Sequence, residues 1–292
     1  MGKEHKKWWQ IIGDIKTPYV YLILMILFIY PFFRPLNFPI VISQPAQDYY
    51  NTIESVPKGG VILMHIGYSI GQMGDQVSTS VSTVKLLLDR AKQDNIKIIF
   101  LSFQSDGIPS LWYILDECGY PDSGHFTGLQ YGVNYVVLPF IPGGEVAMAS
   151  FCKDIWATCP VDYNNTPIAN IPMMQNIKSI ADCNLLIQST GSFDTELMLI
   201  RQFWGAYKLP MLTCEGAGAE SQERGYYPYQ IKGFLAGPNY GAQFEKLTGV
   251  PGLGVSYADV LSVLTIMTMA LIVLGNISFF MEKRQKGVNE KR

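Results

Sequence analysis

Histidine is scarce in this 292-residue chain, which has only three, and this limits the chemistry that we expect from it. His5 lies near the N-terminus, His65 lies inside an apolar run, and His125 lies in the loop segment GYPDSGHFTG. Their spacing does not match that of zinc ligands, and the five cysteines contain no C-x-x-C pair. The sequence therefore predicts no metal site.

Nucleotide-binding motifs and basic clusters are also lacking. Gly67, Gly71 and Gly74 follow the spacing G-x3-G-x2-G, which is neither a dinucleotide fingerprint nor a P-loop. Asp75 would moreover repel a phosphate at the start of the helix that follows. The formal net charge is −2 and there is no basic stripe of the kind that binds nucleic acid. We expect no cofactor and no nucleic-acid partner.

One catalytic signature is present, because Gly67-Tyr68-Ser69-Ile70-Gly71 spells the G-x-S-x-G elbow of an α/β-hydrolase. The motif follows the apolar run VILM and precedes a helix-like segment, as that elbow requires. However, it would end the first strand of its domain, and no histidine after the third predicted strand can act as the general base. A membrane-bound serine hydrolase that uses Ser69 is therefore the alternative hypothesis.

Two apolar runs, Tyr19–Phe33 and Val260–Met281, contain no charged residue. The second reaches the ~20 residues that cross about 30 Å of hydrocarbon, and the first does so only if its neighbours extend the helix. Basic residues precede the first run and follow the second, so the positive-inside bias places both termini in the cytoplasm. We predict a cytoplasmic tail over 1–16, a signal-anchor membrane helix over 17–38, an extracytoplasmic domain over 39–256, a second membrane helix over 257–281 and a basic cytoplasmic tail over 282–292.

Disulfide bonds have little support in the cysteine pattern, since an odd number cannot all pair within one chain. Cys152 and Cys159 could form one only if a helix breaks between them, because seven residues of helix separate Cα atoms by about 10 Å. The other cysteines are expected to be small apolar core residues.

Short apolar runs alternate with helical patterns between the two membrane segments, which predicts a single doubly wound, mostly parallel-sheet α/β domain of Rossmann-like form. The predicted strands are 61–67, 97–103, 133–140, 184–189, 210–215 and 231–237. The clearest amphipathic helices are 75–95 and 193–208. Two helical pieces, predicted over 144–159 and 172–183, flank the loop PVDYNNTPIANI and indicate an insertion near 143–181.

Ligands of such a sheet bind outside the carboxyl ends of its strands, where this sequence places small, polar and acidic residues. A cation, a sugar or a basic partner would suit the acidic residues, which could equally stabilise helix N-termini. The predicted ligand or partner rim consists of Ser69, Asp75, Asp106, Glu145, Ser189, Thr190, Asp194, Glu215 and Asn239.

No complete catalytic set accompanies this rim, so the leading hypothesis is a non-catalytic scaffold, assembly or ligand-sensing subunit of a membrane complex. Thr268 and Gly275 lie seven residues apart on one face of the second membrane helix, where they could admit another helix closely. We therefore expect the lipid bilayer, a membrane-protein partner or a homo-oligomer, and a small polar ligand as binding partners.

Overall fold

The computed structural model describes residues 7–36, 38–120, 126–250 and 252–289, so His125 lies outside the described part of the chain. The chain divides into two compact units, Ile40–Val255 and a second unit of Met1–Pro39 with Ser256–Arg292. Each unit is described by itself.

Six parallel strands form one sheet in the unit Ile40–Val255, which confirms the predicted α/β class. The strands are β1 (Val61–Gly67), β2 (Lys97–Ser102), β3 (Tyr135–Phe140), β4 (Leu185–Thr190), β5 (Met211–Glu215) and β6 (Ile231–Ala236). Their order in the sheet is β3-β2-β1-β4-β5-β6. Consecutive strands run outward from β1 in one direction and from β4 in the other, so the order reverses between β1 and β4.

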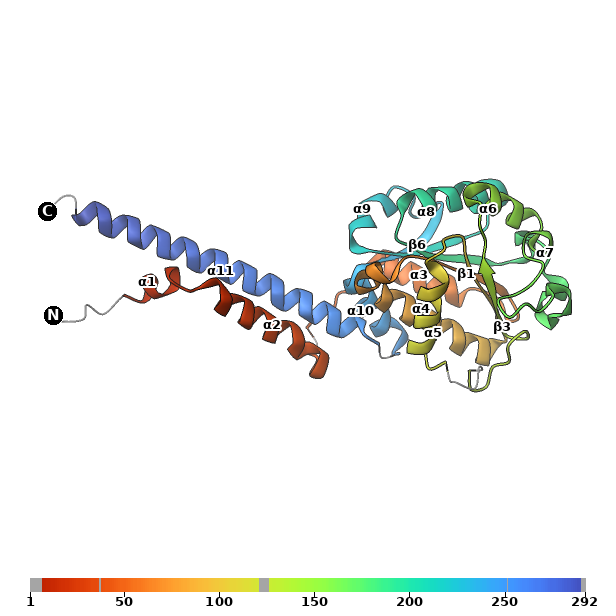
Figure 1. Cartoon of the computed structure of the whole chain (residues 1–292), viewed down its shortest axis with the longest axis horizontal. Helices are drawn as coiled ribbons and strands as arrows, with labels where there is room; N and C mark the ends of the chain where they lie inside the picture. Colours follow the sequence, from red (N-terminus) through yellow and green to blue (C-terminus); the bar gives the residue numbers. More distant parts are fainter. Residues whose placement is uncertain (1–6, 37, 121–125, 251, 290–292) are drawn as a thin grey trace. The chain divides into compact units, whose positions relative to one another are not determined.

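Helices cover both faces of the sheet (Figure 1). One layer contains α4 (Met73–Asp94), α5 (Gly107–Glu117) and α10 (Gly237–Thr248), with α10 packed against α4. The other contains α6 (Gly144–Lys153), α8 (Phe193–Leu199) and α9 (Glu220–Glu223), and α8 continues as the π-helix η5 (Ile200–Gly205). The helix α3 (Gln44–Glu54) packs along the edge strand β6. Because both faces are covered, strands β1 and β4 are buried along their whole length.

The segment predicted as an insertion connects β3 to β4. Its first half forms α6 and α7 (Ile155–Thr158), and its second half forms the short 3-10 helices η2 (Ile168–Asn170), η3 (Pro172–Asn176) and η4 (Ile180–Asp182). The helix predicted over 172–183 is therefore wrong, because Ile177 adopts an extended conformation and separates η3 from η4.

The helix does break between Cys152 and Cys159, since Asp154 is extended between α6 and α7. All five cysteines are nevertheless free thiols, and Cys152 and Cys159 are both buried. The structure therefore has no disulfide at the one position where the sequence allowed it.

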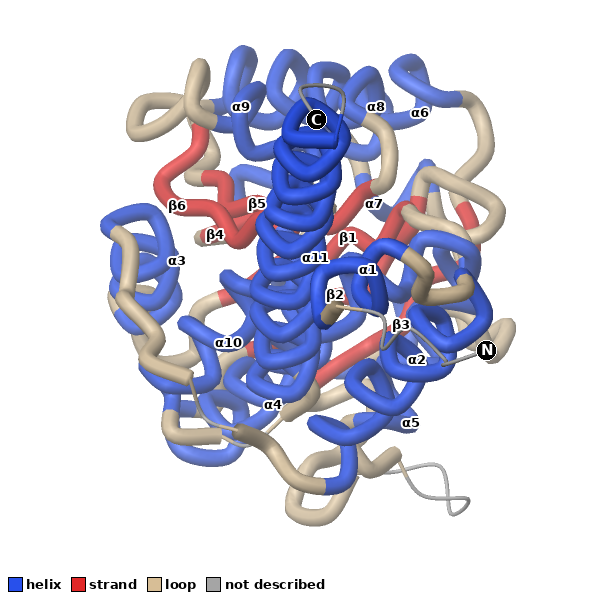
Figure 2. Tube along the Cα trace, turned by 90° about the vertical axis from the view of Figure 1, so that its left-hand side faces the viewer, coloured by secondary structure: helices blue, strands red, loops and turns tan. Residues whose placement is uncertain are grey.

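The other unit contains α1 (Trp8–Gly13), α2 (Thr17–Phe33) and the helix α11 (Gly254–Asn289), the start of which belongs to the α/β unit. Within the described residues, one helix is long and apolar enough to cross a membrane, over Gly254–Gln285, and only 6% of its most apolar stretch is buried within the protein. Figure 2 views the chain with α11 toward the reader. The first predicted membrane helix is not confirmed, since α2 has only 17 residues and ends at Phe33, where Arg34 turns extended ahead of Pro35.

The expected helix-packing residues lie on the exposed part of α11. Thr268 donates a hydrogen bond to the carbonyl of Leu264 one turn earlier, and nothing in the described residues lies within 4 Å of a Cβ built at Gly275. Ser278 instead contacts α1, because its hydroxyl donates to the carbonyl of Trp9 at 2.7 Å. Helix association through Thr268 and Gly275 stays a prediction.

Candidate functional site

A cavity of about 450 Å³ lies where the strand order reverses, at the carboxyl ends of β1, β4 and β2. This reversal is the position at which open α/β sheets bind their ligands. The cavity is lined by Gly67, Ser69, Gln72, Gln104, Ser105, Asp106, Gly191 and Ser192. Amides, hydroxyls, one carboxylate and glycine backbone line the cavity, and it has no basic side chain.

Gln72 links the turn after β1 to the end of β4. Its side-chain oxygen accepts a hydrogen bond from the backbone N–H of Ser69 at 3.0 Å, and its Nε2 donates to the carbonyl of Gly191 at 3.1 Å. A Cβ at Gly191 would lie 2.1 Å from Nε2 of Gln72, so only glycine leaves room for this link. The two strand ends are therefore held together by an uncharged bridge.

Gln104 fastens the end of β2 in the same manner. Its Nε2 donates to the Thr195 hydroxyl at 2.8 Å, and its Oε1 accepts from the Thr190 hydroxyl at 3.3 Å. The Thr190 hydroxyl is also 3.0 Å from the carbonyl of Gly67. These contacts hold the Gln104 amide in a fixed position in the lining of the cavity, where it can recognise polar atoms of a ligand.

A second cavity of about 310 Å³ adjoins the first and shares Gln72 and Gly191 with it. It lies toward the end of β5, and Asp75 and Glu215 are among its lining residues. The Asp75 carboxylate accepts a hydrogen bond from the backbone N–H of Ala217 at 2.9 Å, which ties the start of α4 to the loop after β5. The carboxyl ends of β1, β2, β4 and β5 thus border two adjoining cavities.

The structure brings together some of the predicted rim residues and not others. Ser69 and Asp106 line the first cavity, Asp75 and Glu215 line the second, and Ser189 and Thr190 are fully buried at the end of β4. Glu145, Asp194 and Asn239 line neither cavity. Glu145 is instead held by a bidentate contact to Arg201, with both N–O distances 2.8 Å, which lowers its pKa to about 2.

Ser69 has the surroundings of a capping residue. Its hydroxyl lies 3.3 Å from the Oε1 atom of Gln72 within a reciprocal capping box. His65 is fully buried inside β1, its Nε2 accepts from the backbone N–H of Phe103, and burial lowers its pKa to about 3. Among the described residues, no histidine or lysine forms a hydrogen bond with the Ser69 hydroxyl.

Sequence reasoning missed two of the most unusual side chains in the domain. Glu196 on α8 and Glu223 on α9 have no exposed surface, and they lie with Glu215 of β5 so that one carboxylate oxygen from each is within 4.8 Å of the others. A signal for Glu196 existed, because it lies three and four residues before the buried Leu199 and Ile200 and so shares their helix face. Glu223 lies in a four-residue helix and had no such signal.

Burial raises the pKa of all three glutamates. The pKa of Glu196 rises to about 10, first through loss of solvation and then through the neighbouring Glu223 and Glu215. The pKa of Glu223 rises to about 7, again mainly through burial. The pKa of Glu215 is raised well above its usual range, although Gln188 donates to its Oε1 at 2.8 Å.

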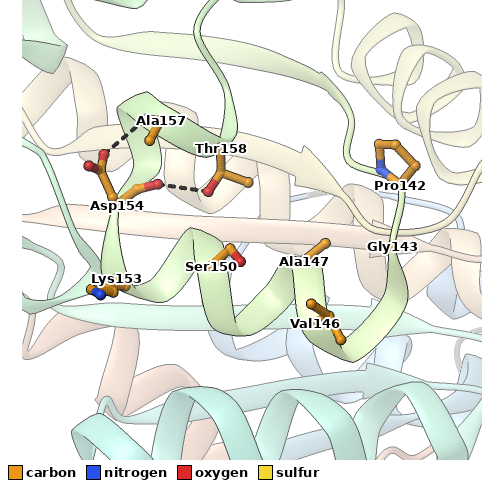
Figure 3. A pocket seen from close by; sticks show the side chains of 9 residues that line it. All are labelled: Pro142, Gly143, Val146, Ala147, Ser150, Lys153, Asp154, Ala157 and Thr158. Carbon is orange, nitrogen blue, oxygen red and sulfur yellow. Dashed lines mark hydrogen bonds between the residues drawn. The ribbon is translucent and has the colours of Figure 1, made fainter.

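A further hollow of about 620 Å³ lies on the connection between β3 and β4 (Figure 3). It is bordered by α6 and α7, and Figure 3 shows Asp154 capping α7 through the backbone N–H of Ala157 at 2.9 Å. Its lining of small, mostly exposed side chains around Val146 and Lys153 includes no buried polar group that could fix a ligand. This hollow is therefore a weaker candidate than the strand-end cavities.

Comparisons of the chain with protein-family models, with curated proteins and with solved structures found no match. Its function is accordingly inferred from its own residues.

Proposed function

We propose that this chain is a membrane-anchored sensing subunit whose α/β domain binds a small, uncharged, hydroxyl-rich molecule. The observation that carries the proposal is the cavity of about 450 Å³ at the β1–β4 reversal, with its lining of amides and hydroxyls. The side chain of Gln72 is held by the turn after β4, and that of Gln104 by Thr190 of β4 and Thr195 of α8, so the cavity is organised before a ligand arrives.

The polarity of the lining sets the class of ligand. Neutral donors and acceptors pair well with hydroxyl groups, and Asp106 adds a carboxylate that can accept from two neighbouring hydroxyls. A phosphate or carboxylate ligand would find no cation here and would be repelled by Asp106 and by the nearby Asp75. A monosaccharide or another polyol therefore fits this chemistry better than an anion.

Binding without catalysis fits the surroundings of Ser69. A serine nucleophile needs a base within hydrogen-bond reach, and the Ser69 hydroxyl instead faces the Gln72 amide. Ser69 in this proposal contributes a hydroxyl to the ligand cavity.

Membrane attachment in this proposal uses both apolar helices. The exposed apolar surface of α11 is stable in lipid and costly in water, and Lys283 and Arg284 follow it as a cytoplasmic flank. A 17-residue helix such as α2 is about 25 Å long, which a locally thinned bilayer can accommodate. With both termini cytoplasmic, the domain between the helices faces outward.

Ligand binding is tested on the full-length chain in lipid nanodiscs. Melting temperature is measured with glucose, galactose, N-acetylglucosamine and myo-inositol, and with glucose 6-phosphate as the anionic comparison. At least one neutral compound is expected to raise the melting temperature, and Gln104→Ala should abolish the rise. Asn239→Ala is the matched control, since this exposed amide lines neither cavity and its loss should leave binding intact. A response to the phosphate alone would overturn the proposed ligand class.

Topology is tested with single engineered cysteines at exposed positions. Asn164→Cys in the α/β domain should react with a membrane-impermeant maleimide on intact cells, and Lys283→Cys should react only after lysis. Labelling of Lys283→Cys alone on intact cells would reverse the proposed orientation.

A further inference from the structure

Three buried glutamates from three different elements converge beneath the second strand-end cavity. Glu196 comes from α8, Glu215 from the end of β5 and Glu223 from α9, and none is more than 3% exposed. One oxygen of each lies within 4.8 Å of the other two. Glu215 also lines the cavity of about 310 Å³, which gives the cluster a route to solvent.

The protein supplies little to compensate this concentration of negative charge. Apart from the contact between the Glu196 and Glu223 carboxyl groups themselves, neither group accepts a well-formed hydrogen bond from the described residues. The ion pairs found in the described part of the chain do not involve these glutamates, and nearby Arg224 turns to Glu220 instead. Burying carboxylates without a cation, a proton or hydrogen-bond donors is strongly unfavourable, so the cluster must hold one of them.

Two further buried side chains outside the acidic group contact the cluster, and each has an oxygen without a hydrogen-bond partner among the described residues. The Thr213 hydroxyl has no exposed surface and is directed at the Glu223 carboxylate, whose pKa it lowers, yet no described atom completes a hydrogen bond to it. Gln188 is also fully buried, and while its Nε2 donates to Glu215, its Oε1 has no partner in the described chain. A hydroxyl and an amide carbonyl oxygen are ligands that a hard cation takes together with carboxylates.

We infer that Glu196, Glu215 and Glu223 form a binding site for one hard divalent cation, with Thr213 and Gln188 as supporting oxygen groups. Three atoms within 4.8 Å of one another can all lie about 2.8 Å or less from a common centre. Calcium binds oxygen at 2.3–2.6 Å, so side-chain shifts of a few tenths of an ångström complete the contacts.

Calcium suits this site better than magnesium or zinc. Calcium accepts six to eight oxygen ligands in flexible geometry, whereas magnesium requires a near-ideal octahedron and retains several waters. Zinc prefers nitrogen and sulfur, and this cluster offers only oxygen. Cation binding displaces the protons held by the three carboxyl groups, and its two positive charges offset two of the three negative charges that this exposes. The inference goes beyond the proposed function and does not depend on the neutral ligand.

Calcium titration of the full-length chain in nanodiscs tests the inference after the protein has been stripped with EDTA. The probes are CaCl₂, MgCl₂ and MnCl₂, with isothermal calorimetry for stoichiometry and melting temperature for stabilisation. One Ca²⁺ should bind per chain and raise the melting temperature by about 5 °C or more at saturation. Glu196→Gln and Glu223→Gln should each weaken binding by about tenfold or more, because each removes a charged ligand.

Glu117→Gln is the matched control, because Glu117 is exposed at the end of α5. This variant should bind Ca²⁺ as the unchanged chain does. The glutamine variants also distinguish a cation site from a cluster that holds only protons, through the sign of their effect on the stability of the chain in calcium. If the cluster holds only protons, Glu196→Gln removes the free-energy cost of protonating this buried carboxyl group on folding, and it stabilises the chain in EDTA and in calcium equally. That result, or the absence of saturable binding of all three cations to the stripped wild-type chain, would overturn the site whether or not a variant folds. Tight binding of Mn²⁺ or Mg²⁺ without Ca²⁺ would retain the site and reject calcium.

Discussion

The pH dependence of stability offers the sharpest prediction for the buried glutamates. In EDTA, raising the pH from 6.5 to 8 should destabilise the folded chain, because Glu196 has a pKa of about 10 when folded and 4.5 as its ordinary value. A folded-state pKa above the unfolded value gives stability that is full at low pH and is lost as the pH rises toward the folded pKa. Across this interval the unfolded chain has released the proton while the folded chain still holds it.

The magnitude follows from the proton linkage. For one proton retained only in the folded chain, each pH unit lowers the free energy of unfolding by about 1.4 kcal/mol, so the interval of 1.5 pH units lowers it by about 2 kcal/mol. Glu215, whose pKa is also raised, acts in the same direction. His65 acts in the opposite direction, but above its ordinary pKa of 6.5 only about 0.4 kcal/mol of its stabilisation is still to be gained, which is why the interval starts there.

Urea unfolding of the full-length chain, followed by circular dichroism at pH 6.5, 7.25 and 8, measures this effect. Glu196→Gln cannot release a proton and should show a shallower loss of stability across the same interval. With saturating Ca²⁺ the loss should shrink or reverse, since the cation binds the deprotonated carboxylates. A wild-type chain that gains stability with pH in EDTA, or a Glu196→Gln variant with an unchanged slope, would refute the reasoning.

Three further predictions concern the strand-end site and the core. Gly191→Ala should lower the free energy of unfolding, measured in urea, by about 1–2 kcal/mol, because the added Cβ would displace the Gln72 amide from two hydrogen bonds. Gly74 has open space around it, so Gly74→Ala should leave the free energy of unfolding unchanged. Arg90→Met should lower the free energy of unfolding by about 3 kcal/mol in the same assay, since the buried guanidinium donates to the carbonyls of Ile53 in the last turn of α3 at 2.9 Å and of Val56 just after α3 at 2.8 Å. An unchanged midpoint would contradict that. Ser69→Ala should leave the labelling of the purified chain by a fluorophosphonate serine probe unchanged, and a loss of labelling would restore the hydrolase hypothesis.

The strands of this fold could be predicted from the sequence because a parallel sheet is buried on both faces. A strand covered by helices on both faces must be apolar on both, so β1 appears as the uninterrupted run VILMHIG and its predicted bounds match those of the structure. The other five runs also mark strands, with ends that shift by up to two residues, as at β3.

The errors arise where local conformation depends on contacts that periodicity does not record. The run of apolar residues after Thr17 predicts a helix beyond Phe33, but the polypeptide turns at Arg34, and Asp259 accepts hydrogen bonds from the backbone N–H groups of Leu36 and Phe38. Within 172–183, local backbone turns replaced the expected helix.

Only part of the candidate site was predictable. Glu215 ends β5, and Ser69 and Asp106 lie two and four residues after β1 and β2, so the rule that strand ends carry ligands identifies them. Glu223 lies eight residues after β5 and reaches Glu196 only through the packing of α9 against the sheet, which no spacing in the sequence encodes.

Native mass spectrometry of the full-length chain, extracted gently into nanodiscs without added ligand, tests the central claim most directly. The proposed function predicts that the wild-type chain carries a small neutral adduct that is absent from Gln104→Ala and retained by Asn239→Ala. An adduct that Gln104→Ala retains, or a wild-type chain that carries none and binds none of the neutral probe compounds, would contradict it.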